Sequence, residues 1–146
     1  MNRICALGLG TVALLLGACS HPEIVFVDAT LSVDDKVTID KISRLRGKLT
    51  PRKLHVAHPD WWRFRVLDAN GKQLYEGDLH EPRPKYVQVY NEDGSMEMVP
   101  AATDKPVPIV VRYPYHEDAY TLELRRMDPS KGDYVVLATL PLEGAR

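Results

Sequence analysis

The sequence predicts an all-β fold, a two-sheet antiparallel sandwich preceded by a signal peptide. First, Val, Ile, Tyr, Leu and Trp recur with a period of two after residue 20, and helix signals are almost absent. Second, clusters of Asn, Asp, Gly and Pro separate these alternating segments at short intervals, as hairpin turns do. Third, the first 18 residues have the charge and hydropathy pattern of a secretory leader.

The leader begins with one basic residue, Arg3, and continues as an apolar run from Ile4 to Leu16 that ends in the small pair Gly17-Ala18. A charged start, an apolar middle and a small-residue cleavage site are the three parts of a signal peptide. The run is shorter than the roughly 20 residues that a helix needs to cross a bilayer. Residues 1–18 are therefore predicted to be a signal peptide, and a permanent span is the weaker interpretation.

The end of this leader, Leu16-Gly17-Ala18-Cys19, resembles the lipobox of bacterial lipoproteins. In that family the chain is cut before the cysteine, whose thiol and new amino group are acylated. The resemblance implies that Cys19 is the lipidation residue and that residues 19–23 form a short tether. Since Ser20 follows Cys19 in place of the family's retention signal Asp, it also implies the periplasmic face of the outer membrane. An ordinary signal peptide is the alternative.

The cysteine count then limits how the folded part can be stabilised. The chain has two cysteines. Cys5 lies in the predicted leader and Cys19 would carry lipid, so none remains for a disulfide. The single domain predicted over residues 24–146 must therefore depend on an ordinary hydrophobic core. The formal net charge of −1 points to no particular partner, and we expect no nucleic-acid binding.

Nine strands are expected in the folded part, and turn residues mark several of their connections. The expected ranges are 24–33, 36–45, 61–68, 72–78, 85–91, 95–99, 107–113, 119–127 and 134–141. Hairpin turns are expected at 68–71, 91–94 and 128–132, because each segment places Asn or Gly where the backbone needs a positive φ.

Alternation assigns a core face to most of these strands. The side chains expected to point inward are Trp62, Phe64, Val66, Val87, Val89, Val107, Ile109, Val111, Leu122, Leu124, Val135 and Leu137. Their outward neighbours include Arg63, Arg65, Arg112, Glu123 and Arg125. One buried and one wet face over many short strands favours an immunoglobulin-like sandwich, with a closed barrel as the alternative.

The sequence gives little support for catalysis, and we expect a protein that is not an enzyme and has no cofactor. His116-Glu117 begins like the zinc-peptidase motif H-E-x-x-H, but Tyr120 stands where the second histidine would be. Neither a G-x-S-x-G motif nor a Gly-rich phosphate loop occurs.

Metal binding is an alternative that rests on four residues. Met96 and Met98 place two thioethers on one strand face, a soft pair suited to Cu(I), and His55 and His58 are candidate further ligands for copper or zinc. The opposing interpretation is that the methionines fill gaps in a core and that the histidines are loop residues.

Residues 41–59 form the clearest change in composition, with several basic residues and no acid. Basic side chains near an anionic surface each contribute about 1 kcal/mol of attraction. We therefore expect Arg44, Arg46, Arg52 and Lys53 to orient the domain on lipid headgroups. The alternative is a solvated edge whose charges prevent aggregation.

Aromatic residues supply a further surface hypothesis. Trp61 must point opposite to Trp62, and Tyr86 and Tyr90 opposite to the valines between them. Exposed rings of this kind anchor protein interfaces or stack on cell-wall glycans. They could equally form a peripheral core under loops.

The segments 106–112 and 118–124 are similar to β-sandwich domains of secreted bacterial proteins, including those that precede IgA-peptidase-like metallopeptidases. The resemblance implies a sandwich without the peptidase activity. Together these observations predict a lipid-anchored, non-catalytic interaction or scaffold module. It would be held in the membrane by acyl chains and would bind a periplasmic or envelope protein. A metal-binding module and a glycan-binding module are the alternatives.

Overall fold

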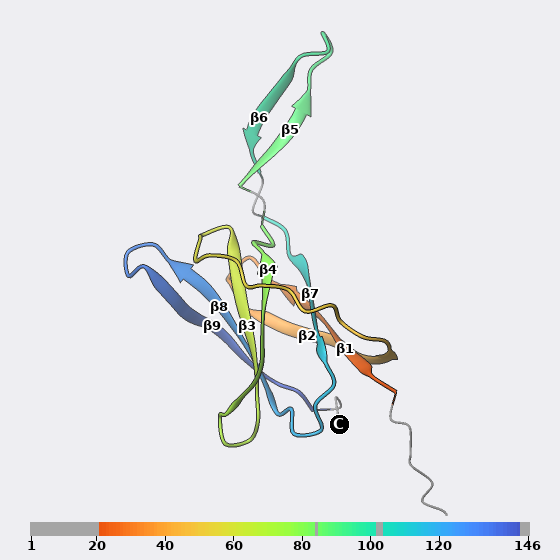
Figure 1. Ribbon diagram of the computed structural model, residues 1–146. Helices are drawn as coiled ribbons and strands as arrows, with labels where there is room; N and C mark the ends of the chain where they lie inside the picture. Colours follow the sequence, from red (N-terminus) through yellow and green to blue (C-terminus); the bar gives the residue numbers. More distant parts are fainter. Residues whose placement is uncertain (1–20, 84, 102–103, 144–146) are drawn as a thin grey trace, which may run out of the picture.

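A computed structural model describes residues 21–83, 85–101 and 104–143 of the chain as an all-β protein (Figure 1). The strands are β1 (Glu23–Leu31), β2 (Val37–Arg46), β3 (Trp61–Leu67), β4 (Gln73–His80), β5 (Tyr86–Tyr90), β6 (Met96–Pro100), β7 (Val107–Pro114), β8 (Thr121–Asp128) and β9 (Asp133–Pro141). All nine were expected from the sequence, and each end lies within two residues of its expected position.

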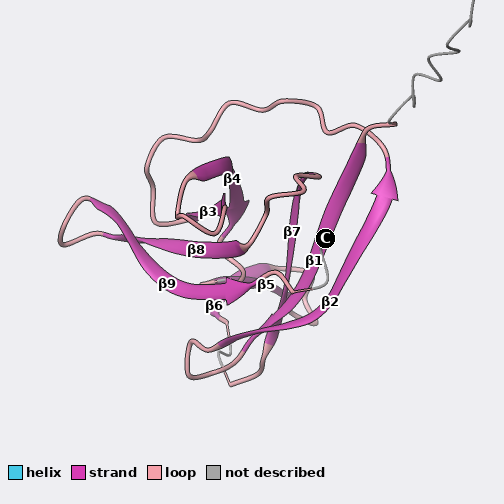
Figure 2. Cartoon of the chain, turned by 90° about the horizontal axis from the view of Figure 1, so that it is seen from below, coloured by secondary structure: helices cyan, strands magenta, loops and turns pink. Residues whose placement is uncertain are grey.

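The strands form three antiparallel sheets, with orders β2-β1-β7, β4-β3-β8-β9 and β5-β6. The two larger sheets share one hydrophobic core, and Figure 2 shows a long loop running from the end of β2 across to β3. Within the described ranges, β5 and β6 pair with each other and with no further strand. They form an arm, residues 86–100, that projects away from the two larger sheets (Figure 1).

The core is built from alternate residues of the central strands. β1 buries Val25, Val27 and Leu31 completely, and β3 buries Trp62 and Val66 to 1% exposure or less. β7 of the three-stranded sheet and β8 of the four-stranded sheet contribute the other central core residues, Ile109, Val111, Tyr113, Leu122 and Leu124. Each fully buried side chain of this size stabilises the fold by roughly 1.5–3 kcal/mol. The inward face expected for β3, β7 and β8 is thus confirmed.

One glycine is required by this packing. Gly77 of β4 lies opposite Phe64 of β3 in the sheet. A Cβ atom at Gly77 would lie 2.4 Å from the Cζ atom of the Phe64 ring. The ring therefore lies directly over the backbone of β4, and any side chain at position 77 would displace it.

The three expected hairpin turns are present. Gly71, Gly94 and Gly132 have φ values of 79°, 81° and 67°, which L-residues rarely adopt. In the first turn, Asp68 Oδ1 accepts hydrogen bonds from the backbone amides of Asn70 and Lys72, both at 2.8 Å. Turn chemistry read from the sequence therefore located these reversals correctly.

The expected inward orientation of Val87 and Val89 is wrong. Both are 40% exposed, because β5 belongs to the arm and no second sheet of the described chain covers either of its faces. The alternation of apolar and polar residues indicates that a strand has two chemically different faces, but it does not indicate which part of the protein packs on each face.

The expected inward pair on β9, Val135 and Leu137, is partly buried, and Leu137 packs against the core. Leu140, at 8% exposure, is the buried core residue of this strand. Tyr134, at 5% exposure, lies outside the core, with Arg63 at 4.5 Å from the centre of its ring. The register between β8 and β9 shifts between Leu124 and Arg125, which inserts an extra residue into β9, so Leu140 and Val135 share a face although their numbers differ in parity.

Candidate functional site

The predicted lipidation residue, Cys19, and the signal peptide 1–18 lie outside the described residues. The chain is held to the fold from Pro22 onward, because the Gly47 amide donates to the Pro22 carbonyl at 2.9 Å. The Tyr115 amide donates to the Glu23 carbonyl at the same distance. In the described part of the chain, no helix is long and apolar enough to cross a bilayer.

The arm brings together the two tyrosines of the surface-aromatic hypothesis and the two methionines of the metal-binding hypothesis. Its register places Tyr90 opposite Met96, Gln88 opposite Met98 and Tyr86 opposite Pro100. Directly opposed residues of an antiparallel pair share a face, and so do residues two apart. Tyr86, Tyr90, Met96 and Met98 therefore form one surface, the tyrosine–methionine face, with exposures of 58%, 72%, 56% and 56%.

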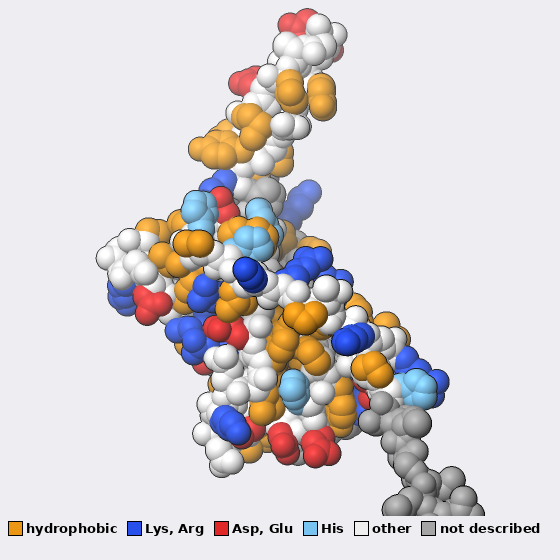
Figure 3. All heavy atoms as spheres, in the orientation of Figure 1, with side chains coloured by type: hydrophobic (Ala, Val, Ile, Leu, Met, Phe, Trp, Pro, Cys, Tyr) orange, Lys and Arg blue, Asp and Glu red, His pale blue; other side chains and the backbone are white. Residues whose placement is uncertain are grey.

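The tip of the arm is acidic and internally ordered. Ser95 donates to Asp93 Oδ1 through its amide at 2.8 Å and through its hydroxyl at 2.6 Å. These hydrogen bonds lower the pKa of Asp93 below its ordinary value, and the bond from the Ser95 hydroxyl has the larger effect. Glu92 and Glu97 add two more carboxylates, and residues 86–100 contain no Lys or Arg. Figure 3 shows apolar side chains along the arm and acidic ones at its tip.

The root of the arm is fastened to the body by ion pairs. Lys85 Nζ donates to Asp60 Oδ1 at 2.9 Å, a hydrogen bond that raises the pKa of the lysine and lowers that of the aspartate. Arg83 donates to Asp35 Oδ1 at 2.7 Å and also to the Ser32 carbonyl. These contacts tie both the β3 end of the long loop and the β1–β2 turn to the start of the arm.

The four arginine and lysine residues expected on the membrane surface have different environments. Arg44 donates to Glu23 Oε2 at 2.5 Å and lies 3.7 Å from the centre of the Tyr115 ring. The hydrogen bond to Glu23 raises the arginine's pKa, and the pairing neutralises much of its charge. Arg46 is exposed at the end of β2, whereas Arg52 and Lys53 line a cavity.

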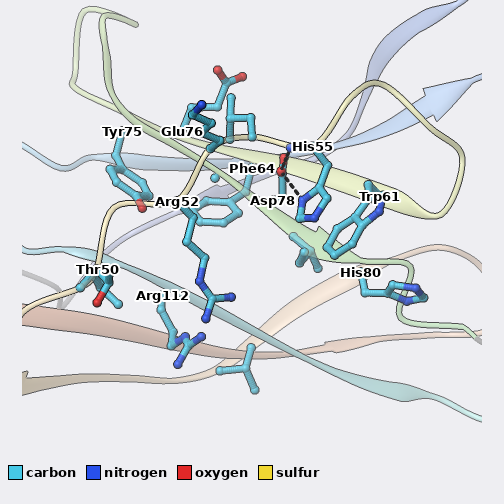
Figure 4. Close-up of a pocket in the computed structure, with 16 residues that line it drawn as sticks. Thr50, Arg52, His55, Trp61, Phe64, Tyr75, Glu76, Asp78, His80 and Arg112 are labelled. Carbon is cyan, nitrogen blue, oxygen red and sulfur yellow. Dashed lines mark hydrogen bonds and ion pairs between the residues drawn. The ribbon is translucent and has the colours of Figure 1, made fainter.

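This cavity, the basic cavity, has a volume of about 300 Å³ and lies between segment 47–60, β4 and β7 (Figure 4). It is lined by Leu49, Thr50, Arg52, Lys53, Leu54, His55, Trp61, Phe64, Tyr75, Glu76, Gly77, Asp78, Leu79, His80, Val110 and Arg112. The sequence indicated the basic segment and the outward position of Arg112, but not their convergence. Only the adjacency of β4 and β7, strands of different sheets, brings them together.

Trp61 forms one wall of the basic cavity. The ring of His55 stacks on it with centroids 3.6 Å apart and planes 8° apart, and His80 meets it at an angle of 76°. Trp61 does point away from the core while Trp62 is buried. One face of the Trp61 ring is covered by His55, which leaves only the other face for a sugar.

The histidines proposed as metal ligands contact different carboxylates. His55 donates to the nearly buried Asp78 through its backbone amide at 2.5 Å, and its ring Nδ1 lies 3.0 Å from the same oxygen. The amide of Asp60 donates to His58 Nδ1 at 3.2 Å. Met96 and Met98 are on the arm. Over residues 21–83, 85–101 and 104–143, no three His, Cys, Asp or Glu side chains are grouped to hold a metal.

Comparison with known proteins gives no assignment: no family model, curated protein or solved structure matches this chain. The resemblances to lipoproteins and to sandwich domains near metallopeptidases therefore stay predictions. The function must be inferred from the arm, the basic cavity and the N-terminal segment.

Proposed function

We propose that this protein is a lipid-anchored, non-catalytic interaction module on the periplasmic face of the bacterial outer membrane, and that the arm binds an envelope protein. The projecting arm with its exposed tyrosine–methionine face is the observation that carries the proposal. An isolated two-stranded hairpin is marginally stable in water. A partner that covers one face of the arm would supply the burial that the arm lacks.

The residue types of the tyrosine–methionine face suit protein recognition. Tyrosine offers a large rigid surface with a polar tip and is frequent among residues that dominate binding energy. Methionine adapts its unbranched side chain to irregular surfaces. Exposed apolar patches with polar surroundings are typical of interaction sites, and here Glu92 and Asp93 follow Tyr90 in the turn at the end of the patch.

The position of the arm fits an anchor at Cys19. Pro22 is hydrogen-bonded to the body, and two residues, Ser20 and His21, separate it from the acylated cysteine, so the three steps of chain reach at most roughly 11 Å. Figure 1 shows the arm at the end of the molecule opposite to the start of β1. With the start of β1 held near the lipid, the arm would extend away from the membrane by about 17 Å beyond its root.

The strand order favours an immunoglobulin-like assignment for the two larger sheets. The neighbours β3, β8 and β9 correspond to strands C, F and G, with β4 in the place of C′. β1 pairs with β7 as strand B pairs with E. β2 occupies the outer position of strand A although it follows β1 in the chain, which departs from the usual connectivity.

Site-specific photocrosslinking in intact cells tests the proposal. A photoreactive amino acid at Tyr90 is expected to give a defined adduct of higher mass, whereas the same group at Val136, 52% exposed on β9, is expected to give none. With the photoreactive group at Tyr90, Met96→Ser combined with Met98→Ser should abolish the adduct, whereas Val87→Thr combined with Val89→Thr, on the opposite face, should reduce it less. Equal adducts from Tyr90 and Val136, or none from Tyr90, would refute the role of the arm.

A further inference from the structure

We propose that the basic cavity is a binding site for an oxyanion, a phosphate or carboxylate group carried on a small apolar body. The site is separate from the arm and independent of the function proposed for it. Its Arg and Lys residues come from segment 47–60 and from β7, which lie far apart in the sequence.

Two guanidinium groups define the site. Arg52 comes from the long loop and Arg112 from β7, and both line the cavity, as Figure 4 shows. Lys53 adds a third positive charge to the lining. Among the described residues, no carboxylate oxygen lies within 4.0 Å of any of these three side chains. Like charges that line one small cavity repel, and an anion bound among them would be attracted to each.

The carboxylates of the basic cavity are already paired with other cations. Glu76 Oε1 accepts a hydrogen bond from Arg65 Nε at 3.0 Å. Asp78, whose side chain is 8% exposed, accepts from the His55 amide and lies 3.6 Å from Arg63 Nε. Arg65 and Arg63, which do not line the cavity, therefore offset the charges of Glu76 and Asp78. The positive charges of Arg52, Lys53 and Arg112 remain to give the cavity a positive potential.

The geometry of the cavity limits the ligand. A volume of about 300 Å³ lies at the small end of ligand-binding cavities, so one oxyanion and a body of ring size would fill it. Phe64, Tyr75 and Val110 provide an apolar lining. Arginine presents a planar fork of N–H donors that matches phosphate and carboxylate oxygens in pairs, which gives the site its preference for such groups.

The oxyanion could belong to a soluble compound or to an anionic lipid headgroup, and one experiment separates these sources. The full chain is placed in phosphatidylcholine nanodiscs, and the ¹H–¹⁵Nε signals of Arg52 and Arg112 are followed by NMR while phenyl phosphate or, separately, uncharged phenol is added. A parallel sample replaces part of the phosphatidylcholine with phosphatidylglycerol. The matched control is Arg46→Gln, an exposed arginine of β2 outside the cavity.

Phenyl phosphate is expected to shift both arginine signals saturably, and phenol is expected to leave them in place. Arg112→Gln and Arg52→Gln should each weaken binding by about tenfold or more, since each removes charge-assisted hydrogen bonds, while Arg46→Gln should change it less than about twofold. Signals shifted by phosphatidylglycerol alone would support the site and identify the headgroup as its source. Absence of saturable shifts from both sources up to about 10 mM ligand, or equal weakening by Arg112→Gln and Arg46→Gln, would overturn the proposal.

Discussion

Replacement of Gly77 by alanine tests the packing that joins the core to the basic cavity. The added Cβ would lie 2.4 Å and 2.6 Å from two atoms of the Phe64 ring, far inside normal contact distance. Overpacking of this kind costs roughly 1–3 kcal/mol. Alanine regains about 0.5–1 kcal/mol over glycine within a strand. We therefore expect Gly77→Ala to lower the free energy of unfolding by about 1–2 kcal/mol.

The assay is urea denaturation of the wild type, Gly77→Ala, Phe64→Leu and the double variant. A smaller side chain at position 64 leaves room for the new methyl group, so the double variant should be no less stable than Phe64→Leu alone, within about 0.5 kcal/mol. The melting temperature of Gly77→Ala should fall by about 3–10 °C, given the size of the domain. Additive losses in the double variant would show that the Phe64 ring is not the group displaced.

Three further outcomes are expected. Tyr113 is fully buried, its hydroxyl has no hydrogen-bond partner among the described residues, and burial raises its pKa to about 12. Because the unfolded chain releases this proton near pH 10, the wild type should lose stability as pH rises from about 10 to 12. Tyr113→Phe should lose less there in alkaline denaturation, and at pH 7 it should be as stable as the wild type or about 1 kcal/mol more stable. A marked loss at pH 7 would mean that the hydroxyl is satisfied. Ser95→Ala removes the hydroxyl donor to Asp93, so the carboxyl pKa measured by NMR titration should rise toward its ordinary value. An unchanged titration would contradict the ordered tip. Cys19→Ser should release the protein from membranes and lower its mass by that of the acyl chains, which fractionation and mass spectrometry measure. Retention at unaltered mass would contradict the anchor.

The sequence by itself determined the strands, the turns and most of the core. Side chains in a strand alternate faces, so Trp62 and Val66 could be assigned to the interior from their spacing alone. A tight reversal needs a residue that tolerates positive φ, so Gly71, Gly94 and Gly132 marked the hairpins. Both signals depend on residues that are neighbours in the chain.

Only the tertiary structure decided what each strand packs against. The arm has the same alternation as the core strands, yet Val87 and Val89 are exposed because no second sheet lies over them. The bulge in β9 has no local signal, because it arises from how β9 pairs with β8. Burial is a property of the assembled layers, and a period-two pattern carries no information about them.

The candidate sites follow the same division. Exposed tyrosines and a methionine pair were recognisable in the sequence, but their common face depends on the register between β5 and β6. Arg52 and Arg112 were each recognisable as surface cations. They line one cavity only because the long loop crosses from β2 to β3 beside the neighbouring edges of β4 and β7. Charge and residue type are written in the sequence, whereas convergence of distant side chains requires the folded chain.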